Sequence, residues 1–488
     1  MTRGDKMLTI NKTKQSEIIF MSMEEMVPED SLYRKIDEMI DFTFIYAEVK
    51  DCYCENNGRP SIDPVVLFKL VMIQTLDGIK SMRKTCDKIK VDAEYRWFLG
   101  IPFGERTPHF STFSKNYERR FKDSDIFENI FLNIVRQAID YGLVSGEVFY
   151  TDSTHKKANA NKNNYYEELE ESISTRRKWL EEEINEERLK NNRKPFEYQE
   201  KVTRKKVRKS PVDPESGYYH RDEKEKGYMY LDHRTTDDKC NIIVDCHITK
   251  GNVHDSQPYI ERMEYIKEKY NFKIKAVGLD SGYQSLDIKK YLYDEGIVGA
   301  IGYRRYGTKK SRAHKHQFIY DKTQDLYIHK ETAEVIKYTG LIDKNGYKKY
   351  TNTEKDIVLR RHIKEELNEH FNQIRLSEEG KKLLKRRKET IERSFADSKQ
   401  NHGYRYAMFR GLKRNQHYTW LICAAQNIKN IVLKRTKVKN NIKKELEILK
   451  SSLILNIQRL KTSILSYLKE ERKTPYFSLL KNRGLSTV

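Results

Sequence analysis

The stretch AVGLDSGY (residues 276–283) sets an acidic residue directly behind a short apolar run. The mainly apolar residues 274–279 predict a strand that is buried on both faces of a sheet. Asp280 ends this strand, and Ser281 and Gly282 form the turn that follows. In open α/β sheets, binding sites form beyond the carboxyl ends of strands. The stretch therefore predicts a sheet edge that carries a functional carboxylate.

A second acidic residue has the same setting much earlier in the chain. In VFYTDST (residues 148–154), Asp152 follows a β-type run and precedes Ser153 and Thr154. If the two strands are neighbours, Asp152 and Asp280 lie close together. Two like charges so near resist joint ionisation unless a cation bridges them. Mg²⁺, which prefers hard oxygen ligands, is the predicted cation.

A third carboxylate, Glu392, is expected on a basic helix that contains ETIERSF (residues 389–395). Lys385, Lys388, Glu392 and Lys399 are spaced at i, i+3, i+7 and i+14, which places them on one face of a regular helix. A face with one carboxylate between cations suits a site that binds both a metal ion and a phosphate. Taken singly, each of the three acids could equally be a surface charge or a helix cap.

The joint pattern predicts a metal-dependent site that acts on a phosphodiester. Asp152, Asp280 and Glu392 are the predicted catalytic residues and ligands of two Mg²⁺ ions, for which Mn²⁺ should substitute. Lys388, Arg393 and Lys399 are the predicted contacts of the substrate phosphates. Weaker candidates for the wall of the cleft are His155, Lys156 and Asn159, whereas His254 is expected to cap or pack rather than act as a base.

The charge balance indicates which polymer carries the phosphodiester. The 488 residues include 94 Lys and Arg against 72 Asp and Glu, a net charge of +22 with a pI near 9.3. A basic excess of this size favours binding to DNA or RNA through phosphate neutralisation and counterion release. The alternative is a Lys-rich protein whose charge serves only its solvated surface.

The order of expected elements predicts an α/β catalytic domain over residues 144–433. Strands are expected at 148–151, 228–236, 242–249, 274–279 and 298–301, with helices after the third and fourth. This succession of strands and helices indicates a mixed sheet with flanking helices. Two inserts interrupt it, at about 163–226 and 303–366. Within the first, residues 165–191 are expected to be a charged helical arm, and the basic run 201–209 is a candidate phosphate contact.

Both ends of the chain are expected to be helical. Residues 1–143 read as short helices joined by tight turns, such as 64–74 behind the cap Asp63, which suits a DNA-binding domain or a packing domain. Arg119 and Arg120 near its last helix are the predicted DNA contacts. In the basic tail, 434–488, apolar residues from Ile442 to Leu468 form one helical stripe. That stripe either packs back on the protein or forms a homodimer.

Other classes of protein are disfavoured. No apolar run approaches the ~20 residues of a membrane span, and residues 1–17 do not resemble a signal peptide. The six cysteines form no C-x-x-C pair, so no zinc site is expected. A cytoplasmic protein, associated with the nucleoid, is the expectation.

The quoted motifs resemble those of bacterial insertion-sequence transposases of the DDE class along nearly the whole chain. The resemblance rests on GRPSIDPVVLFKLVMIQ, TDSTHKKANAN, GNVHDS, VGLDSGYQS and ETIERSFADSKQNHGYRYAMFRGL. Many relatives carry Y-x2-R-x3-E-x6-K around the glutamate. Here Glu392 and Lys399 match, whereas Lys388 replaces the arginine and Lys385 the tyrosine. The cysteine cluster that close relatives often carry in the second insert is missing.

The resemblance implies an RNase H-like five-stranded sheet with Asp152, Asp280 and Glu392 as the catalytic triad. It also implies binding to the terminal inverted repeats of the element, strand cleavage and strand transfer, with a homodimer on DNA to serve two ends. Two alternatives stay open: an inactive, transposase-derived DNA-binding protein, and a metal-dependent nuclease without strand transfer.

Overall fold

The structure is a computed structural model. It describes residues 18, 20–54, 60–173, 177–200, 202–220, 226–303, 317–354 and 357–471. The chain divides into two compact units, residues 1–429 and 430–488. The ends of the predicted terminal domains and parts of both inserts, including Lys201 of the basic run, lie outside the described residues.

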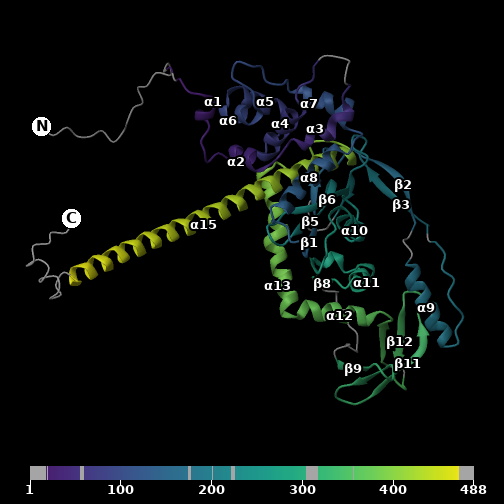
Figure 1. The fold of residues 1–488 in the computed structure, drawn as a ribbon. Helices are drawn as coiled ribbons and strands as arrows, with labels where there is room; N and C mark the ends of the chain where they lie inside the picture. Colours follow the sequence, from purple (N-terminus) through teal and green to yellow (C-terminus); the bar gives the residue numbers. More distant parts are fainter. Residues whose placement is uncertain are drawn as a thin grey trace, which may run out of the picture. The chain divides into compact units, whose positions relative to one another are not determined.

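A mixed sheet forms the centre of the first unit (Figure 1). Its strands are β1 (Val148–Lys157), β4 (Gly217–Tyr219), β5 (Gly227–Asp237), β6 (Ile243–Lys250), β7 (Ala276–Leu279) and β8 (Val298–Ile301). β5 pairs antiparallel with β1 on one edge and with β6 and β4 on the other, whereas β1, β7 and β8 run parallel. The α/β architecture expected from the sequence is confirmed. The sheet has six strands rather than five, because β4 of the first insert also pairs with β5.

The alternation of side chains along β1 explains how helices cover the sheet. Tyr150 points to one face, where it packs with Ile391 and Phe395. Phe149 therefore points to the opposite face, where its ring lies 5.6 Å from that of Phe272. The covering helices on the Tyr150 face are α13 (Glu378–Arg387), a π-helical turn η5 (Lys388–Glu392) and α14 (Arg393–Asn401). The connections between the later strands contain α10 (Tyr259–Tyr270), η3 (Ser281–Tyr283) and α11 (Leu286–Asp294).

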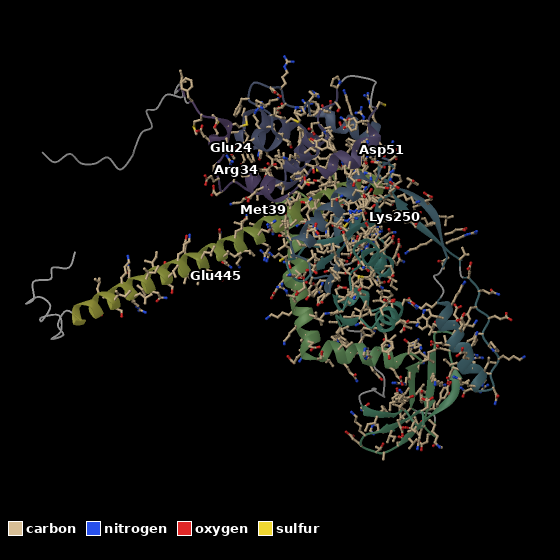
Figure 2. All side chains as sticks on the ribbon, viewed as in Figure 1. Glu24, Arg34, Met39, Asp51, Lys250 and Glu445 are labelled. Carbon is tan, nitrogen blue, oxygen red and sulfur yellow. The ribbon has the colours of Figure 1, made fainter. Side chains whose placement is uncertain are left out.

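The described residues between 23 and 140 form mainly helices, as the sequence predicts. The elements are α1 (Met23–Met26), α2 (Leu32–Met39), α3 (Phe44–Val49), η1 (Lys50–Cys52), α4 (Pro64–Leu76), α5 (Met82–Val91), α6 (Ala93–Leu99), α7 (Ser111–Asn116), η2 (Tyr117–Phe121) and α8 (Ile126–Asp140). Asp63 caps α4, because its Oδ1 accepts a hydrogen bond from the backbone N of Val65 at 2.7 Å. Glu24 and Arg34, which form an ion pair, lie side by side in Figure 2. The boundary of an N-terminal domain near residue 143 stays a prediction.

The first insert differs from the expected helical arm. Residues 166–173 form β2 (Tyr166–Ile173), which pairs antiparallel with β3 (Val202–Lys209), and α9 (Lys178–Lys190) is the helix among the residues described there. The acidic side chains of β2 lie opposite the basic run, so that Arg204 contacts Glu171 at 2.7 Å and Lys209 contacts Glu170 at 3.0 Å. The helical prediction is wrong for residues 166–173, because that strand is stabilised by a partner about thirty to forty residues away, and it holds for residues 178–190. Much of the positive charge of the basic run is matched within the ribbon.

The second insert contains a separate antiparallel sheet. Its strands are β9 (Phe318–Asp321), β10 (Leu326–His329), β11 (Val335–Ile342), β12 (Tyr347–Thr351) and β13 (Val358–His362), in the order β13-β12-β11-β10-β9. The buried core of the sheet comprises Phe318, Tyr327, Ile336, Tyr350 and Leu359. The helix α12 (Glu365–Leu376) follows and leads to α13.

The last described element is the long helix α15 (Leu412–Glu471). Its part in the second unit carries the predicted apolar stripe, and the described side chains of that stripe, from Ile442 to Ile464, are exposed. Leu468 lies outside the residues whose side chains are described. The alternatives of packing back or dimerisation both stay predictions. In the part of the chain that the structure describes, no helix is long and apolar enough to cross a membrane.

A buried histidine joins the N-terminal helices to α15 within the first unit. The ring of His417 stacks on Phe127 at 4.6 Å, and its Nδ1 lies 3.1 Å from the hydroxyl of Tyr117. Burial lowers the pKa of His417 from its ordinary 6.5 to about 4, and the nearby Lys413 acts in the same direction. The native protein therefore holds this imidazole neutral where the unfolded chain would protonate it.

We expect His417→Phe to reduce the acid sensitivity of the fold. As pH falls from about 6.5 to about 4, the unfolded chain takes up the proton first, so native stability is lost over that window. Between about pH 7 and pH 5, the wild type should lose about 2 kcal/mol more than the variant, which keeps the aromatic stack. Urea unfolding at both pH values measures this difference. Equal losses would show that His417 does not contribute.

Candidate active site

Two carboxylates lie where the parallel pairing of β1 with β7 ends. Asp280 follows β7, whereas Asp152 lies within β1, which continues to Lys157 and so is longer than the predicted strand 148–151. Thr151 of β1 is in register with Leu279 of β7. The next residues, Asp152 and Asp280, therefore lie on neighbouring strands at the same edge of the sheet. Asp280 leaves β7 and caps the turn η3, where its Oδ1 accepts a hydrogen bond from the backbone N of Gly282 at 2.5 Å. The structure therefore brings these two predicted residues together.

The carboxylate of Asp152 is largely withdrawn from water. Burial raises its pKa to about 6, and the negative charge of Asp280 acts in the same direction. The guanidinium of Arg387 opposes this effect, with Nη1 donating to Oδ2 at 2.6 Å. The backbone N of Ser153 donates to Oδ1 at 2.8 Å. A buried carboxylate next to a second one has the chemistry expected of a cation ligand.

Glu392 is connected to Asp152 through Arg387. Nη2 of Arg387 donates to Oε1 of Glu392 at 3.0 Å, and the same guanidinium reaches Asp152 through Nη1. Glu392 is half exposed, whereas the side chain of Arg387 is only 14% exposed. Arg387 therefore joins two of the three predicted acids, and Glu392 reaches Asp152 from the helical side through it.

The helix that carries Glu392 is not regular, which corrects the predicted basic face. The π-helical turn η5 separates α13 from α14. A π-turn pairs residues i and i+5, and Arg387 precedes Glu392 by five. The 3.6-residue spacing assumed for Lys385, Lys388 and Glu392 does not hold across this turn. The prediction from the sequence therefore does not include Arg387. The one sequence feature that indicates it is its place in a run of four basic residues, 385–388.

The predicted cations have different surroundings. Lys399 of α14 reaches β1, where its Nζ donates to Thr154 Oγ1 at 2.5 Å, two residues beyond Asp152 on the same strand. Lys388 and Arg393 are exposed, as are Arg119 and Arg120 of η2. The guanidinium of Arg120 lies 4.6 Å from the ring of Tyr53.

The weaker candidates for the cleft wall are partly corrected. Lys156 is buried, its Nζ lies 4.4 Å from the Tyr404 ring, and burial lowers its pKa to about 7. It therefore does not line an open cleft. His155 stacks on Tyr219 at 3.9 Å. His254 binds Ser256 within a local turn through Nδ1, at 2.8 Å from Oγ, which agrees with a capping role.

A fourth carboxylate, Asp255, lies at the same edge. Its Oδ1 accepts a hydrogen bond from Ser153 Oγ at 2.6 Å. A Cβ placed on Gly282 would lie 2.9 Å from Asp280 Oδ1 and 3.0 Å from Asp255 Oδ2, so both oxygens converge on this glycine. The motif GNVHDS contains Asp255, but its spacing gives no sign of contact with β1.

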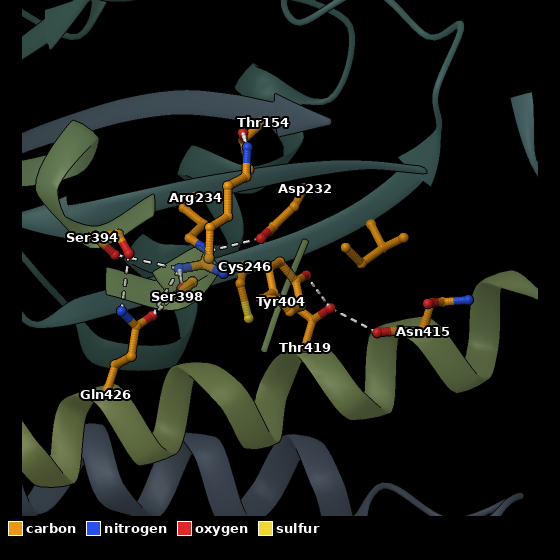
Figure 3. A network of polar contacts seen from close by, with 12 residues as sticks. Thr154, Asp232, Arg234, Cys246, Ser394, Ser398, Tyr404, Asn415, Thr419 and Gln426 are labelled. Atoms are coloured by element: carbon orange, nitrogen blue, oxygen red, sulfur yellow. Dashed lines mark hydrogen bonds and ion pairs between the residues drawn. The ribbon is translucent and has the colours of Figure 1, made fainter. Parts of the chain in front are cut away.

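Arg234 fastens the helical layer to the sheet next to the carboxylates. It lies opposite Asp152 in the β1–β5 register. Its Nη1 donates to Ser398 Oγ of α14 at 2.7 Å and to Gln426 Oε1 of α15 at 2.9 Å (Figure 3). Its Nε donates to Asp232 at 2.8 Å, and both charged groups are fully buried. An arginine in a strand is usually a polar, exposed position, so no pattern in the sequence predicts this contact.

The donor set fits a divalent cation only in part. Asp152 and Asp280 offer adjacent hard oxygen ligands. Among the described residues, however, no three side chains of Asp, Glu, His or Cys are grouped so that they could hold a metal ion. Arg387 accounts for this in part, because its guanidinium bridges Glu392 and Asp152.

Two family models match parts of the chain. Residues 21–119 match the model described as "Transposase domain (DUF772)", and residues 345–432 match the "Transposase DDE domain". No curated protein sequence matches the chain. Among solved structures, the chain is similar to a piggyBac transposase in a synaptic complex with hairpin DNA, solved by cryo-EM. That match has 11% identity and a TM-score of 0.31, and it covers 84% of this chain and 74% of that chain.

We expect Arg234→Met to destabilise the first unit by about 3–5 kcal/mol, because it leaves Asp232 charged and buried without its closest partner. Arg204→Met is the matched control. That arginine also pairs with an acid, Glu171, but on the exposed ribbon, and its loss should cost no more than about 1 kcal/mol. Urea unfolding of both variants makes the comparison. Similar costs would mean that the Arg234 network does not fasten the helices.

Gly282→Ala should disturb the carboxylate edge. The new methyl group would meet Asp280 Oδ1 and Asp255 Oδ2 at or below 3.0 Å, so one or both acids must move. We expect a loss of about 1–3 kcal/mol, as for other overpacked sites. Gly104→Ala, where an added Cβ meets nothing within 4 Å, is the control and should be close to neutral. Thermal unfolding of the two variants tests this, and an unchanged midpoint for Gly282→Ala would contradict it.

Proposed function

Because this chain belongs to the DDE transposases of insertion sequences, we propose that it cuts and joins DNA at the ends of its own element. It binds the terminal inverted repeats, hydrolyses phosphodiesters to free 3′-hydroxyls, and transfers those ends to target DNA. The net charge of +22 supports a polyanionic substrate.

The observation that carries the proposal is the pair of carboxylates where the parallel pairing of β1 with β7 ends. Asp152 and Asp280 follow residues in direct register on parallel strands. Burial of Asp152 beside a second carboxylate favours a site completed by a cation. The helix with Glu392 lies across the same edge, connected by Arg387.

We further infer an RNase H-like fold for residues 144–433. Its support is the succession of three antiparallel strands, β1, β5 and β6, followed by two strands parallel to β1, with helices between them. The site lies at the carboxyl ends of the parallel strands, where α/β sheets bind ligands.

In the proposed mechanism, Asp152, Asp280 and Glu392 hold divalent cations, expected to be two Mg²⁺ with Mn²⁺ as a substitute. Such ions supply an activated water or 3′-hydroxyl and stabilise the leaving oxygen. Asp255 positions β1 through its hydrogen bond with Ser153. Lys399, fixed near Thr154, orients a phosphate beside Asp152, and the exposed Lys388 and Arg393 bind the flanking backbone.

The other parts of the chain supply DNA recognition and assembly in this proposal. The N-terminal helices with Arg119 and Arg120 bind the element ends. The exposed apolar stripe of α15 supports a homodimer on paired ends. The protein would act in the cytoplasm, at the nucleoid.

The decisive test is cleavage of DNA that ends in the inverted repeats flanking the gene. Asp152→Asn, Asp280→Asn and Glu392→Gln each remove one charged ligand and should lower Mg²⁺-dependent cleavage and joining by about a hundredfold or more. Binding to the same DNA in gel shifts should change little, because many phosphate contacts carry it.

Glu389→Gln is the matched control for this test. Glu389 lies on the same π-turn and pairs with Arg386 at 3.2 Å, away from the proposed ligands, so its variant should cleave normally. Wild-type cleavage by any of the three ligand variants would remove that residue from the site. Cleavage without joining would instead favour a nuclease, and binding without cleavage an inactive derivative.

A further inference from the structure

Arg387 occupies the position between two of the proposed metal ligands. Its Nη1 lies 2.6 Å from Asp152 Oδ2, and its Nη2 lies 3.0 Å from Glu392 Oε1. The planar guanidinium has fixed donor directions that suit two carboxylates at once. One side chain therefore holds together a strand residue and a helix residue that are 240 positions apart in the chain.

This bridge engages the oxygens that a cation would need. Oδ1 of Asp152 already accepts from Ser153 N at 2.8 Å, and Oδ2 accepts from Arg387. Hydrogen bonds between ionised partners are stronger than neutral ones, and Asp152 is largely shielded from water. Arg387 therefore competes with a divalent ion for Asp152 Oδ2 and Glu392 Oε1.

The neighbouring basic residues have other surroundings. Arg386 donates to Asp238 at 2.8 Å, and Lys388 is exposed. The π-turn is what brings position 387, rather than 388, next to Glu392. The bridge is therefore specific to Arg387 and does not follow from the basic character of the segment.

We propose that Arg387 is a positioning residue that holds Asp152 and Glu392 in the metal-free protein and releases them when DNA arrives. This inference rests on the proposed function. Phosphate, like carboxylate, is a preferred bidentate partner of arginine, so a DNA phosphate at this edge can draw the guanidinium away. The cation then gains both carboxylates, and DNA and metal bind with positive coupling through Arg387.

The coupling has a functional consequence. Without DNA, competition from Arg387 keeps the affinity for divalent cations low. The free protein therefore does not hold a bound metal centre that could hydrolyse unrelated DNA. With DNA bound, the same arginine becomes a phosphate contact close to the reacting carboxylates. By linkage, a metal ion at the site must raise the affinity for DNA by the same factor.

The test measures Mn²⁺ binding to the full chain. The electron paramagnetic resonance signal of free Mn²⁺ reports how much of the ion is bound. Without DNA, Arg387→Gln should bind Mn²⁺ about tenfold or more tightly than the wild type. Lys385→Gln is the control, because it removes the same charge from an exposed position two residues away and should change Mn²⁺ affinity little. Adding double-stranded DNA should strengthen Mn²⁺ binding in the wild type and much less in Arg387→Gln.

Arg387→Lys provides a second variant in case the first folds poorly. A lysine is a point charge without the planar fork, so its Mn²⁺ affinity without DNA should lie between those of the wild type and Arg387→Gln. Equal or weaker Mn²⁺ binding by both variants than by the wild type would overturn the inference.

The double variant Asp152→Asn/Arg387→Gln separates this inference from the proposed function. Loss of the tight Mn²⁺ binding in the double variant supports both. Tight binding that survives the loss of Asp152 means that the metal binds elsewhere, which overturns the inference together with the proposed site. If Arg387→Gln binds Mn²⁺ like the wild type while Asp152→Asn abolishes that binding, the role of Arg387 fails and the proposed metal site stands.

Discussion

The buried ion pair of Arg234 with Asp232 is the interaction on which the edge with Asp152 and Asp280 depends. A fully buried charge pair is costly to remove from water, and its attraction offsets that cost only when further hydrogen bonds satisfy the remaining donors. Arg234 obtains such bonds for Nη1 from Ser398 and Gln426, which belong to α14 and α15, whereas its Nη2 and Asp232 Oδ1 are buried without a partner among the described residues. A strand and two helices are thereby fixed at one point, beside Asp152 on the neighbouring strand. The position of Glu392 and Lys399 over the sheet follows from this attachment.

The π-turn at Lys388–Glu392 is the second constraint. The extra residue in the turn changes which side chain faces the carboxylates. Arg387 faces them, in the place that a regular helix would give to Lys388. π-turns inside helices are frequent at functional sites. Here the turn brings a planar, bidentate cation between two acids, where a lysine would supply only a point charge. The chemistry of the site in its metal-free state depends on this one local irregularity.

The β2–β3 ribbon shows why charge patterns alone mislead. Its acidic strand and its basic strand neutralise each other across the ladder, through contacts such as Arg204 with Glu171. Read locally, the acidic stretch resembles an exposed helix and the basic stretch a phosphate-binding surface. The pairing corrects the helical interpretation of residues 166–173. Arg204, Lys206 and Lys209 are matched by acids of β2, whereas Lys205 and Arg208 are exposed, so phosphate binding by the basic run stays a prediction.

The sequence by itself determined the parts of this protein that depend on local periodicity and on residues at strand ends. The strands β1, β5, β6, β7 and β8, the helix α4 with its Asp63 cap, and the placement of Asp152 and Asp280 behind apolar runs could all be predicted, because burial imposes a short-range pattern. Only the tertiary structure decided that Asp255 meets Ser153, that Arg387 rather than Lys388 faces Glu392, and that Arg234 is buried. Each of these contacts joins positions remote in the chain or depends on a single irregular turn. A remote partner and an irregular turn both leave no periodic signal in the sequence.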